Sequence, residues 1–565
     1  MRKLFFATII VIVSACYADA ATFVSATSGN YRDGATWGNA SPGAAGVDYP
    51  DADIGDTATI STGHTVTLTA AESLYGLTVQ AGATIDLDGY NMLIDDGGFT
   101  VSGTSGSRSN VKSTMWGGSF TTSSGSTLTW AYADFNGIGN STYDLPPDGG
   151  SHSWSYVTTT NCGRIYFNEA WAYASNGFVI SHCNFGVPNA SATNNEIMRL
   201  IFGSTDNGAV TGTRYIEHSI FDGGDSSTKN FYKTTGGMPI RDCIFNNIII
   251  SSASNRGGEP FTNTCGFFYT QGAGSTLIPV PSASTFTGHY IFTSTTNPHT
   301  ISLSDTGTKS TVSNLVMEAT YADTFTDAGD FIILGDAPAD ITGNLLITTK
   351  GGSLTNGIGG ASGSFSIYRN TVYTTNPAPS YGLLLRGESS GNLTGTVVEV
   401  HSNLVVDSSS NATTFGIGPF VAGDDQITYT DYNYWIGVED HYNGMTMATA
   451  SECDAGYGAY DSGSCATNGN AASPGFVDQT RNISTWDISL GGSGTPANAI
   501  TEMLKLNKSD YNSAYNILDL VTYVKAGFVP TNIAYNGTGK DGVDIGAMDY
   551  QSTDTINAAP LMMGF

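Results

Sequence analysis

Three stretches in the middle of the chain share one pattern: Ile180-Ser-His-Cys-Asn-Phe185, Ile216-Glu-His-Ser-Ile-Phe221 and Ile240-Arg-Asp-Cys-Ile-Phe245. Each is an apolar residue, a short polar group that ends in Cys, Ser or Asn, and a second apolar group. Later copies begin at Val312, Ile341, Ile367 and Val400. Aligned on the Cys, Ser or Asn, the copies fall at positions 183, 219, 243, 314, 344, 370 and 403.

The spacing of these copies predicts a β-solenoid. The gaps are 36, 24, 71, 30, 26 and 33 residues, which suits coils of variable length with two or three degenerate coils in the longest gap. A single copy cannot bury its apolar side alone, so the copies must stack. Their β-branched residues favour strands over helices. We therefore expect an all-β chain of about sixteen stacked coils.

The composition excludes some classes of partner. Lys and Arg total 21 against 49 Asp and Glu, which gives a net charge of −28. Such a surface repels nucleic acids and anionic membranes, and it binds acidic sugars only if a cation bridges the two. The 70 glycines fit many tight turns between short strands.

The first residues have the features of an export signal. Arg2 and Lys3 precede the apolar stretch 4–15, which is short for a membrane span. We expect residues 1–20 to be removed after the A-x-A site that ends at Ala20. The alternative is a bacterial lipobox, Val13-Ser-Ala-Cys16, which would leave a lipid anchor on Cys16. We expect no other membrane span, and a secreted or cell-surface protein.

An even number of cysteines follows the signal. They are Cys162, Cys183, Cys243, Cys265, Cys453 and Cys465. In an exported protein this count predicts disulfides. The first two cysteines are about one coil apart, as are the next two, so we expect each pair to bridge adjacent coils. The last pair would close a small loop. Buried free thiols are the alternative.

The remaining sequence divides into three regions. We expect an N-terminal cap over 21–60, coils over 61–440 and a C-terminal cap over 441–565. The C-terminal region should contain a Cys-bracketed loop, two helices and a closing strand. Apolar residues at three-to-four spacing predict the helices over 497–506 and 515–525.

The repeated pattern resembles that of right-handed parallel β-helix proteins of the pectin-lyase-like class. Gly34-Ala-Thr-Trp37 and Gly55-Asp-Thr-Ala-Thr-Ile60 are similar to the N-terminal segments of this class. The ending Asp541-Gly-Val-Asp-Ile-Gly-Ala-Met-Asp549 is similar to the close of many secreted bacterial members, and Arg481 to Gly492 to phage-borne and environmental ones. The resemblance implies the fold only, because the class contains lyases, hydrolases, phage spikes and adhesins.

The repeat itself contains candidate catalytic residues. His182, His218 and Asp242 each precede the aligned Cys or Ser, and Glu217 and Arg241 lie one position earlier. In stacked coils such equivalent positions form ladders along one exposed strip. A carboxylate beside a neutral His can act as acid and base, and two carboxylates can hydrolyse a glycosidic bond. Glu217 facing Arg241 is equally an ordinary cross-strand ion pair.

Aromatic residues are a second candidate site. Trp154, Tyr156, Trp171 and Tyr173 crowd into one segment with Tyr166 and Phe167. Exposed rings stack on sugar faces, so these four residues, together with Arg241, are predicted to bind substrate. The alternative is a packed lateral loop.

A glycine-containing turn carries candidate calcium ligands. Asp51, Asp53 and Asp56 lie in it and supply carboxylate oxygens. A solvated turn without metal is the alternative, because the spacing matches no EF-hand loop.

From these observations we expect a non-catalytic extracellular protein that binds glycans or builds extracellular structure. A polysaccharide hydrolase or lyase is the first alternative, and a phage-type receptor-binding spike is the second. Assembly into oligomers or filaments, through the apolar end Ala559 to Phe565, also remains open.

Overall fold

The computed structural model describes most of the chain between residues 20 and 549. The described residues are 20–51, 55–123, 126–144, 152–168, 177–201, 213–224, 229–234, 239–252, 261–270, 276–280, 283–294, 299–303, 308–320, 329–330, 332–333, 338–348, 352–353, 365–375, 380–383, 398–408, 414–417, 427–431, 433–436, 440–442, 473–486, 495–510, 513–533, 536–537, 544 and 546–549. The predicted signal up to Asp19 and the Cys453–Cys465 loop lie outside them, as does the apolar end.

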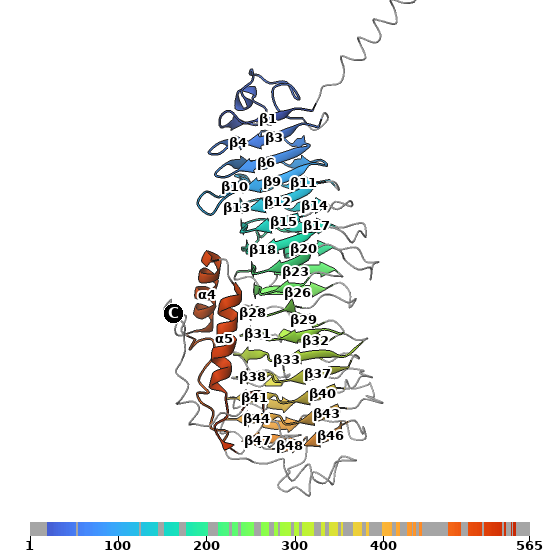
Figure 1. Cartoon of the computed structure of the whole chain (residues 1–565), viewed down its shortest axis with the longest axis vertical. Coiled ribbons are helices and arrows are strands. Elements are labelled where there is room, and N and C mark those ends of the chain that lie inside the picture. The colour runs from blue at the N-terminus through green and yellow to red at the C-terminus, as the bar shows by residue number, and fades with distance from the viewer. Residues whose placement is uncertain are drawn as a thin grey trace, which may run out of the picture. The chain divides into compact units, whose positions relative to one another are not determined.

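The chain divides into two compact units. Unit 1 contains residues 1–216 and 230–236, and unit 2 contains residues 217–229 and 237–565. In each unit the chain visits three sides in turn, and each strand pairs in parallel with the equivalent strand of the next coil. This order defines a parallel β-helix, as predicted (Figure 1). We call the three sides sheets I, II and III.

The strands of unit 1 are distributed over the three sheets as follows. Sheet I contains β1 (Thr22–Val24), β3 (Thr57–Ile60), β6 (Gly76–Gln80), β9 (Gly98–Ser102), β12 (Thr127–Ala131), β15 (His152–Ser155) and β18 (Phe178–Ser181). Sheet II contains β2 (Gly29–Asn30), β4 (Thr65–Thr67), β7 (Thr84–Asp86), β10 (Ser109–Lys112), β13 (Ala133–Asn136), β16 (Thr158–Thr160) and β19 (Asn184–Phe185). Sheet III contains β5 (Glu72–Leu74), β8 (Met92–Ile94), β11 (Phe120–Thr122), β14 (Ser141–Asp144), β17 (Ile165–Asn168), β20 (Glu196–Ile201) and the part of β23 (Lys229–Thr234) from Asn230 on.

Unit 2 repeats the scheme. Sheet I contains the last residue of β21 (Arg214–Glu217), then β24 (Ile240–Arg241), β27 (Phe261–Thr262), β30 (Thr285–Thr287), β33 (Ser310–Ser313), β37 (Ala339–Thr342), β40 (Phe365–Tyr368), β43 (Val398–His401) and β46 (Ile427–Asp431). Sheet II contains β22 (Ile220–Asp222), β25 (Ile244–Asn246), β28 (Gly266–Tyr269), β31 (Tyr290–Thr293), β34 (Val316–Ala319), β38 (Leu345–Thr348), β41 (Thr371–Thr374), β44 (Leu404–Asp407) and β47 (Tyr434–Ile436). Side III contains β26 (Ile248–Ser252) and three short sheets, with β29 (Thr276–Val280), β32 (His299–Leu303) and β36 (Ile332–Ile333) in the first, β35 (Gly329–Asp330) and β39 (Gly352–Ser353) in the second, and β42 (Ser380–Leu383), β45 (Thr414–Ile417) and β48 (Asp440–Tyr442) in the third.

The side chains stack in rows because equivalent residues of successive coils lie in register. In unit 1 the buried rings of Trp130 and Trp154 stack with their centroids 3.9 Å apart. In unit 2 the rings of Phe221, Phe245 and Phe267 stack at 5.0 and 5.5 Å. These spacings follow the strand separation of about 4.8 Å. Each coil therefore buries its apolar side against its neighbours.

An asparagine ladder fills one inner corner of unit 2. The side-chain amides of Asn344, Asn370 and Asn403 donate to the Oδ1 atoms of Asn370, Asn403 and Asn433 at 2.9, 3.0 and 2.9 Å respectively. All four residues are fully buried. The ladder satisfies amides that would be costly to bury alone.

The ladder corrects one position in the alignment of the repeat copies. The residue in register with Asn344 is Leu315, because Val316 pairs with Leu345. Asn314 is instead exposed, at the bend with φ 56°. Two further coils, with Cys265 and His289 at the ladder position, lie in the longest gap of the repeat, as expected.

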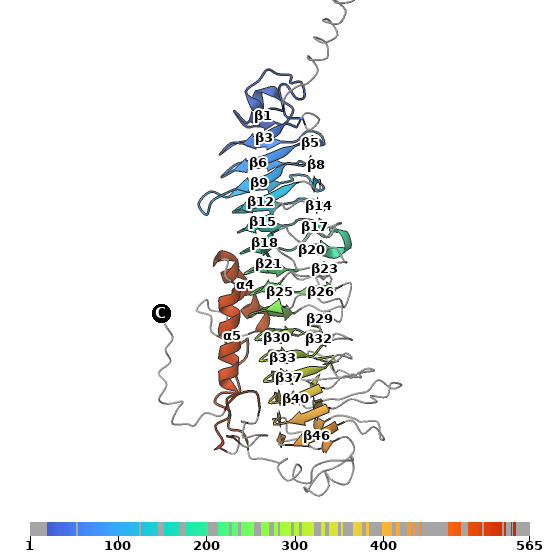
Figure 2. The same ribbon diagram turned by 45° about the vertical axis from the view of Figure 1, so that its right-hand side comes forward.

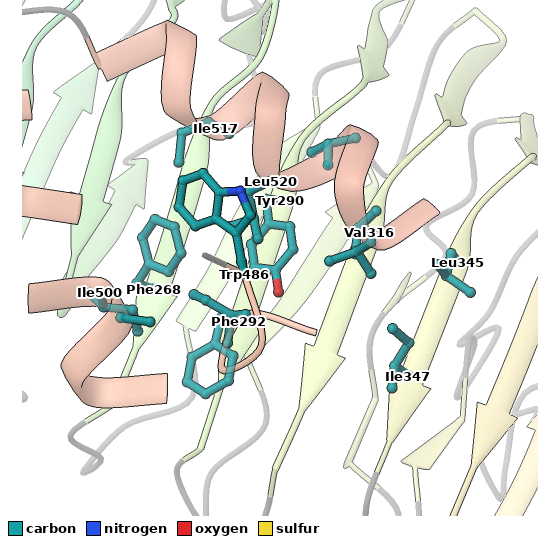
Figure 3. Packing of buried hydrophobic residues seen from close by; sticks show 14 of the residues in the cluster. Phe268, Tyr290, Phe292, Val316, Leu345, Ile347, Trp486, Ile500, Ile517 and Leu520 are labelled. Atoms are coloured by element: carbon teal, nitrogen blue, oxygen red, sulfur yellow. The ribbon is translucent and has the colours of Figure 1, made fainter. Parts of the chain in front are cut away.

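The two predicted helices are present, but their place differs from the prediction. Helices α4 (Pro496–Asp510) and α5 (Ser513–Gly527) contain both predicted stretches. They lie along the outward face of sheet II in unit 2 and do not cap its last strand (Figures 1 and 2). That face is apolar and must be covered, so the helices bury it along its length (Figure 3).

The last described residues form no strand, contrary to the expected closing strand. The backbone N–H groups of Gly546 and Ala547 donate to Ser402 O and Thr371 Oγ1 at 2.9 and 2.8 Å. Met548 belongs to the same buried cluster as the apolar residues of α5. We call the described residues from Ser473 to Asp549 the helical arm. It includes α4 and α5.

The predicted N-terminal cap is already part of the coils, because β1 pairs with β3 and β2 with β4. The short helix η1 (Gly34–Trp37) brings Trp37 edge-on against Phe23 and Tyr31, so buried rings fill this first coil. In sheet III of the same unit, η3 (Thr193–Asn195) precedes β20. None of the described helices has the length and hydropathy needed to cross a membrane.

Candidate functional site

Each coil passes from sheet I to sheet II through a sharp bend. One residue at the bend has a positive φ: 47° at Tyr132, 56° at Tyr156 and 54° at His182 in unit 1, and 47° at His218 and 53° at Asp242 in unit 2. The next residue of the chain points into the core, and it is Cys183, Ser219 or Cys243 in the later coils. The predicted histidines and Asp242 therefore lie at the outward corner of the coils.

In unit 1 this corner carries a stack of rings. The rings of Tyr132 and Tyr156 are parallel with centroids 4.5 Å apart, and His182 stacks on Tyr156 at 5.0 Å. Arg108 donates to Tyr156 O at 2.8 Å and pairs with Asp134 at 2.8 Å. All three rings are partly exposed. His182 thus belongs to an aromatic row.

In unit 2 the corner carries charges. Arg241 Nε and Nη2 lie 2.8 and 2.7 Å from the same carboxylate oxygen of Glu217. Asp242 accepts from Asn263 Nδ2 at 3.0 Å and from Thr264 N at 3.3 Å. The backbone N–H of His218 donates to Arg241 O at 3.3 Å. The expected Glu217–Arg241 ion pair is confirmed, and both predicted carboxylates already hold hydrogen bonds.

Asp222 lies away from this corner. It is on the outward face of sheet II, where it pairs with Lys508 of α4 at 2.6 Å and accepts from Asn246 at 2.8 Å. Burial alone would raise the pKa of Asp222, but the nearby Lys508 ammonium and the hydrogen bonds outweigh it and lower the pKa. Its role is to hold the helical arm.

The aromatic prediction is wrong for one of its residues. Trp154 is 1% exposed and packs in the core of unit 1, because it alternates inward on β15. It therefore offers no ring to a ligand. Tyr156 is in the outward stack described above, whereas Trp171 and Tyr173 lie outside the described residues. Tyr166 packs between Arg164 and Arg199, whose guanidinium carbons lie 4.8 and 5.6 Å from its ring centroid.

A different set of exposed aromatic residues lies on unit 1. Tyr90, Met115 and Trp116 are 37%, 54% and 37% exposed. They occupy the turns between sheets II and III of two neighbouring coils, whose strands β8 and β11 pair directly. We call these three residues the turn patch. The sequence contained a signal for this patch. Tyr90 and Trp116 each lie next to a turn glycine and therefore outside the strands, whose alternating pattern directs apolar residues into the core.

One predicted calcium ligand, Asp56, binds backbone N–H groups. Asp56 is fully buried and accepts from the N–H groups of Ala21 at 2.7 Å and Asp51 at 3.0 Å. Asp53 lies outside the described residues. Within the part of the chain that the structure describes, no three His, Cys, Asp or Glu side chains group to hold a metal ion. Both carboxylate oxygens of Asp56 are therefore engaged by the backbone, and the calcium site stays a prediction.

The predicted disulfides are wrong for the four described cysteines, which are buried and not disulfide-bonded. Cys162 follows sheet II whereas Cys183 precedes it, so the two occupy different corners and cannot meet. Cys243 and Cys265 share one corner, where the Cys243 thiol donates to Arg241 O at 3.2 Å. Burial raises the pKa of Cys162 to about 11 and that of Cys183 to about 12, so both stay protonated.

Comparison with known proteins adds little to this geometry. No family model and no curated protein matches the chain. A solved structure described as the crystal structure of pectate lyase Pel9A is similar to it, with 12% identity, coverage of 95% of this chain and 98% of that chain, and a TM-score of 0.25. A similarity at this level says nothing about activity.

Proposed function

We propose that this protein is an exported, non-catalytic β-helix protein that binds neutral glycan chains. The observation that carries the proposal is the turn patch, where Tyr90 and Trp116 expose aromatic rings on two neighbouring coils of unit 1. Flat rings stack on the C–H faces of sugars. Rings repeated from coil to coil suit a chain of sugars better than a single one.

The charge of the molecule supports a neutral ligand. With a net charge of −28, the surface would repel uronate or sulfated chains unless calcium bridged them. Nucleic acid is disfavoured for the same reason.

The geometry of the predicted catalytic strip supports binding without catalysis. One carboxylate oxygen of Glu217 is already bound by both Nε and Nη2 of Arg241, as in an ordinary cross-strand ion pair. Asp242 already accepts hydrogen bonds from Asn263 and Thr264. A polysaccharide hydrolase or lyase is the alternative that an assay must test. A phage-type spike and a filament-forming structural protein are further alternatives.

The test of glycan binding uses immobilised neutral polysaccharides such as cellulose, xylan and β-glucan. We expect Trp116→Ala and Tyr90→Ala each to weaken retention about fivefold, since one stacked ring contributes about 1 kcal/mol. Tyr75→Ala is the matched control, because Tyr75 is also exposed, at 42%, but lies outside the turn patch. Equal retention of all variants would contradict the proposal.

A second assay separates binding from catalysis. We expect the chain length of neutral and acidic polysaccharides to stay unchanged after incubation, with or without calcium. Shortened chains would overturn the non-catalytic proposal. If Glu217→Gln or Asp242→Asn then abolished the shortening with the fold intact, the corner strip would be the active site.

A further inference from the structure

The outward face of sheet II in unit 2 carries two carboxylates in a mainly apolar row. The residues in register along this row are Asp222, Asn246, Phe268, Phe292, Glu318, Ile347, Tyr373, Val406 and Ile436. Asp222 at one end has Lys508 as its counter-ion. Glu318 lies in the middle and is 3% exposed.

The helical arm covers Glu318. Ile483 and Trp486 of the arm pack in the same cluster as Tyr290, Phe292 and helix α5 (Figure 3). The backbone N–H of Ile483 donates to Glu318 Oε2 at 3.0 Å, and the Tyr290 hydroxyl donates to the same oxygen. The other carboxyl oxygen of Glu318, Oε1, can carry the proton of the neutral acid. Neutral Glu318 therefore keeps both hydrogen bonds.

We propose that Glu318 is a pH-sensitive latch: its neutral form holds the helical arm on sheet II, and its ionisation loosens the arm. When the arm is docked, the carboxyl group loses its contact with water. When the arm lifts, Ile483 leaves and the carboxyl group is hydrated. Hydration of the single charge on ionised Glu318 can therefore release the arm.

The direction of the effect follows from linkage. Burial raises the pKa of Glu318 to about 7, although its hydrogen bonds to Tyr290 and Ile483 act to lower it. An exposed Glu318 would titrate near the ordinary value of 4.5. The docked state thus binds the proton more tightly, and its extra stability, complete below about pH 4.5, is lost as the pH rises through about 7.

Other titratable groups of the arm act in different ways. Burial lowers the pKa of Lys525 on α5 to about 8, so this group stays protonated below that pH and strengthens docking only above it. Burial raises the pKa of Asp519, so the pH dependence of docking that comes from Asp519 has the same direction as that from Glu318. Asp519 is exposed, however. Asp222, whose pKa is lowered by Lys508 and by its hydrogen bonds, stays ionised between pH 5 and 7.5.

The experiment is hydrogen exchange of the full chain between pH 5 and 7.5, corrected for the intrinsic pH dependence of exchange. We expect opening of α5 to increase about fiftyfold across this range, while strands β6 and β9 of unit 1 serve as the internal control. A pH-independent α5 in the wild-type protein would overturn the proposal.

Three variants identify the group responsible. Glu318→Gln should make α5 exchange independent of pH, and Asp519→Asn should retain the wild-type dependence. Tyr290→Phe removes one hydrogen bond that lowers the Glu318 pKa, so it should move the midpoint to higher pH. If Glu318→Gln kept the wild-type slope, or if Tyr290→Phe left the midpoint unchanged, Glu318 would not be the latch.

Discussion

At the scale of single residues, the asparagine ladder shows how hydrogen bonding is matched to the coil repeat. The Oδ1 atom of Asn370 accepts from both the backbone N–H and the side-chain amide of Asn344, at 3.1 and 2.9 Å. Its own amide donates to Ile341 O at 2.9 Å. Each asparagine therefore supports the coil on either side, and none of these groups can reach water.

We expect Asn370→Ala to lower the free energy of unfolding of unit 2 by about 3 kcal/mol, because several buried donors and acceptors lose their partner at once. Calorimetry or denaturant unfolding measures the change. Asn498→Ala is the control, since Asn498 is exposed on α4 and should change stability by no more than about 0.5 kcal/mol. Equal effects of both substitutions would show that the ladder adds no stability.

His152 is a buried titratable residue in unit 1. It is 1% exposed, neither ring nitrogen has a hydrogen-bond partner, and burial lowers its pKa to about 3. The unfolded state therefore binds a proton more tightly, so this contribution to stability is present above about pH 6.5 and is lost as the pH falls.

We expect unit 1 to lose about 2 kcal/mol between pH 7 and 5 through His152 alone. His152→Phe should remove this loss and add about 1–3 kcal/mol at pH 7, because a buried unpaired polar group disappears. Hydrogen exchange of β12 and β15 at the two pH values measures it. A variant with the same pH slope as the wild type would exclude His152 as the cause.

The sequence predicted the ladder position but could not orient every residue around it. The repeat correctly placed Ser219 and Cys243 at equivalent positions of neighbouring coils. It missed by one residue at Asn314, because asparagine also suits a bend with positive φ. Trp154 was misplaced because sequence alone does not show which phase of a strand faces the core. Trp116 escaped notice although its neighbouring glycines mark a turn.

At the scale of elements, the strands of sheet II explain where the helices lie. In unit 1 its outward residues are polar, as in Thr84, Asn110 and Asp134. In unit 2 the strands are buried on both faces, as all four residues of β31 and β34 are. Continuous apolar runs such as Tyr290 to Phe292 signal two-sided burial. The three-to-four spacing predicted the helices, but their docking depends on contacts distant in sequence.

Gly266 makes room for the helical arm. A Cβ atom there would lie 2.6 Å from Cδ1 of Ile517 on α5 and 2.7 Å from Cε2 of Phe268. We expect Gly266→Val to weaken arm docking by about 1–3 kcal/mol through this overpacking, seen as faster exchange in α5. Gly106→Val is the control, because a Cβ there has no atom within 4 Å. Unchanged exchange in Gly266→Val would show that Ile517 does not seat on sheet II.

At the scale of the whole molecule, stability is built from contacts between neighbouring coils. Each strand pairs with the equivalent strand one coil away, and each asparagine of the ladder bonds to the neighbouring coils. Stability in such an array is close to a sum of coil and nearest-neighbour contributions. The helical arm adds longer connections within unit 2, because it spans from Asp222 to Leu404.

This organisation predicts that damage stays local. In Asn370→Ala, hydrogen exchange should rise most in β38, β41 and β44, less toward β25, and not at all in β6 and β9 of unit 1. Leu128→Ala, which removes a fully buried side chain from β12, should give the converse pattern within unit 1. An even rise of exchange over both units in either variant would mean that the chain unfolds as a single cooperative body. Because the proposed glycan-binding residues lie in unit 1 and the proposed latch in unit 2, local responses would also let Trp116→Ala and Glu318→Gln be interpreted independently.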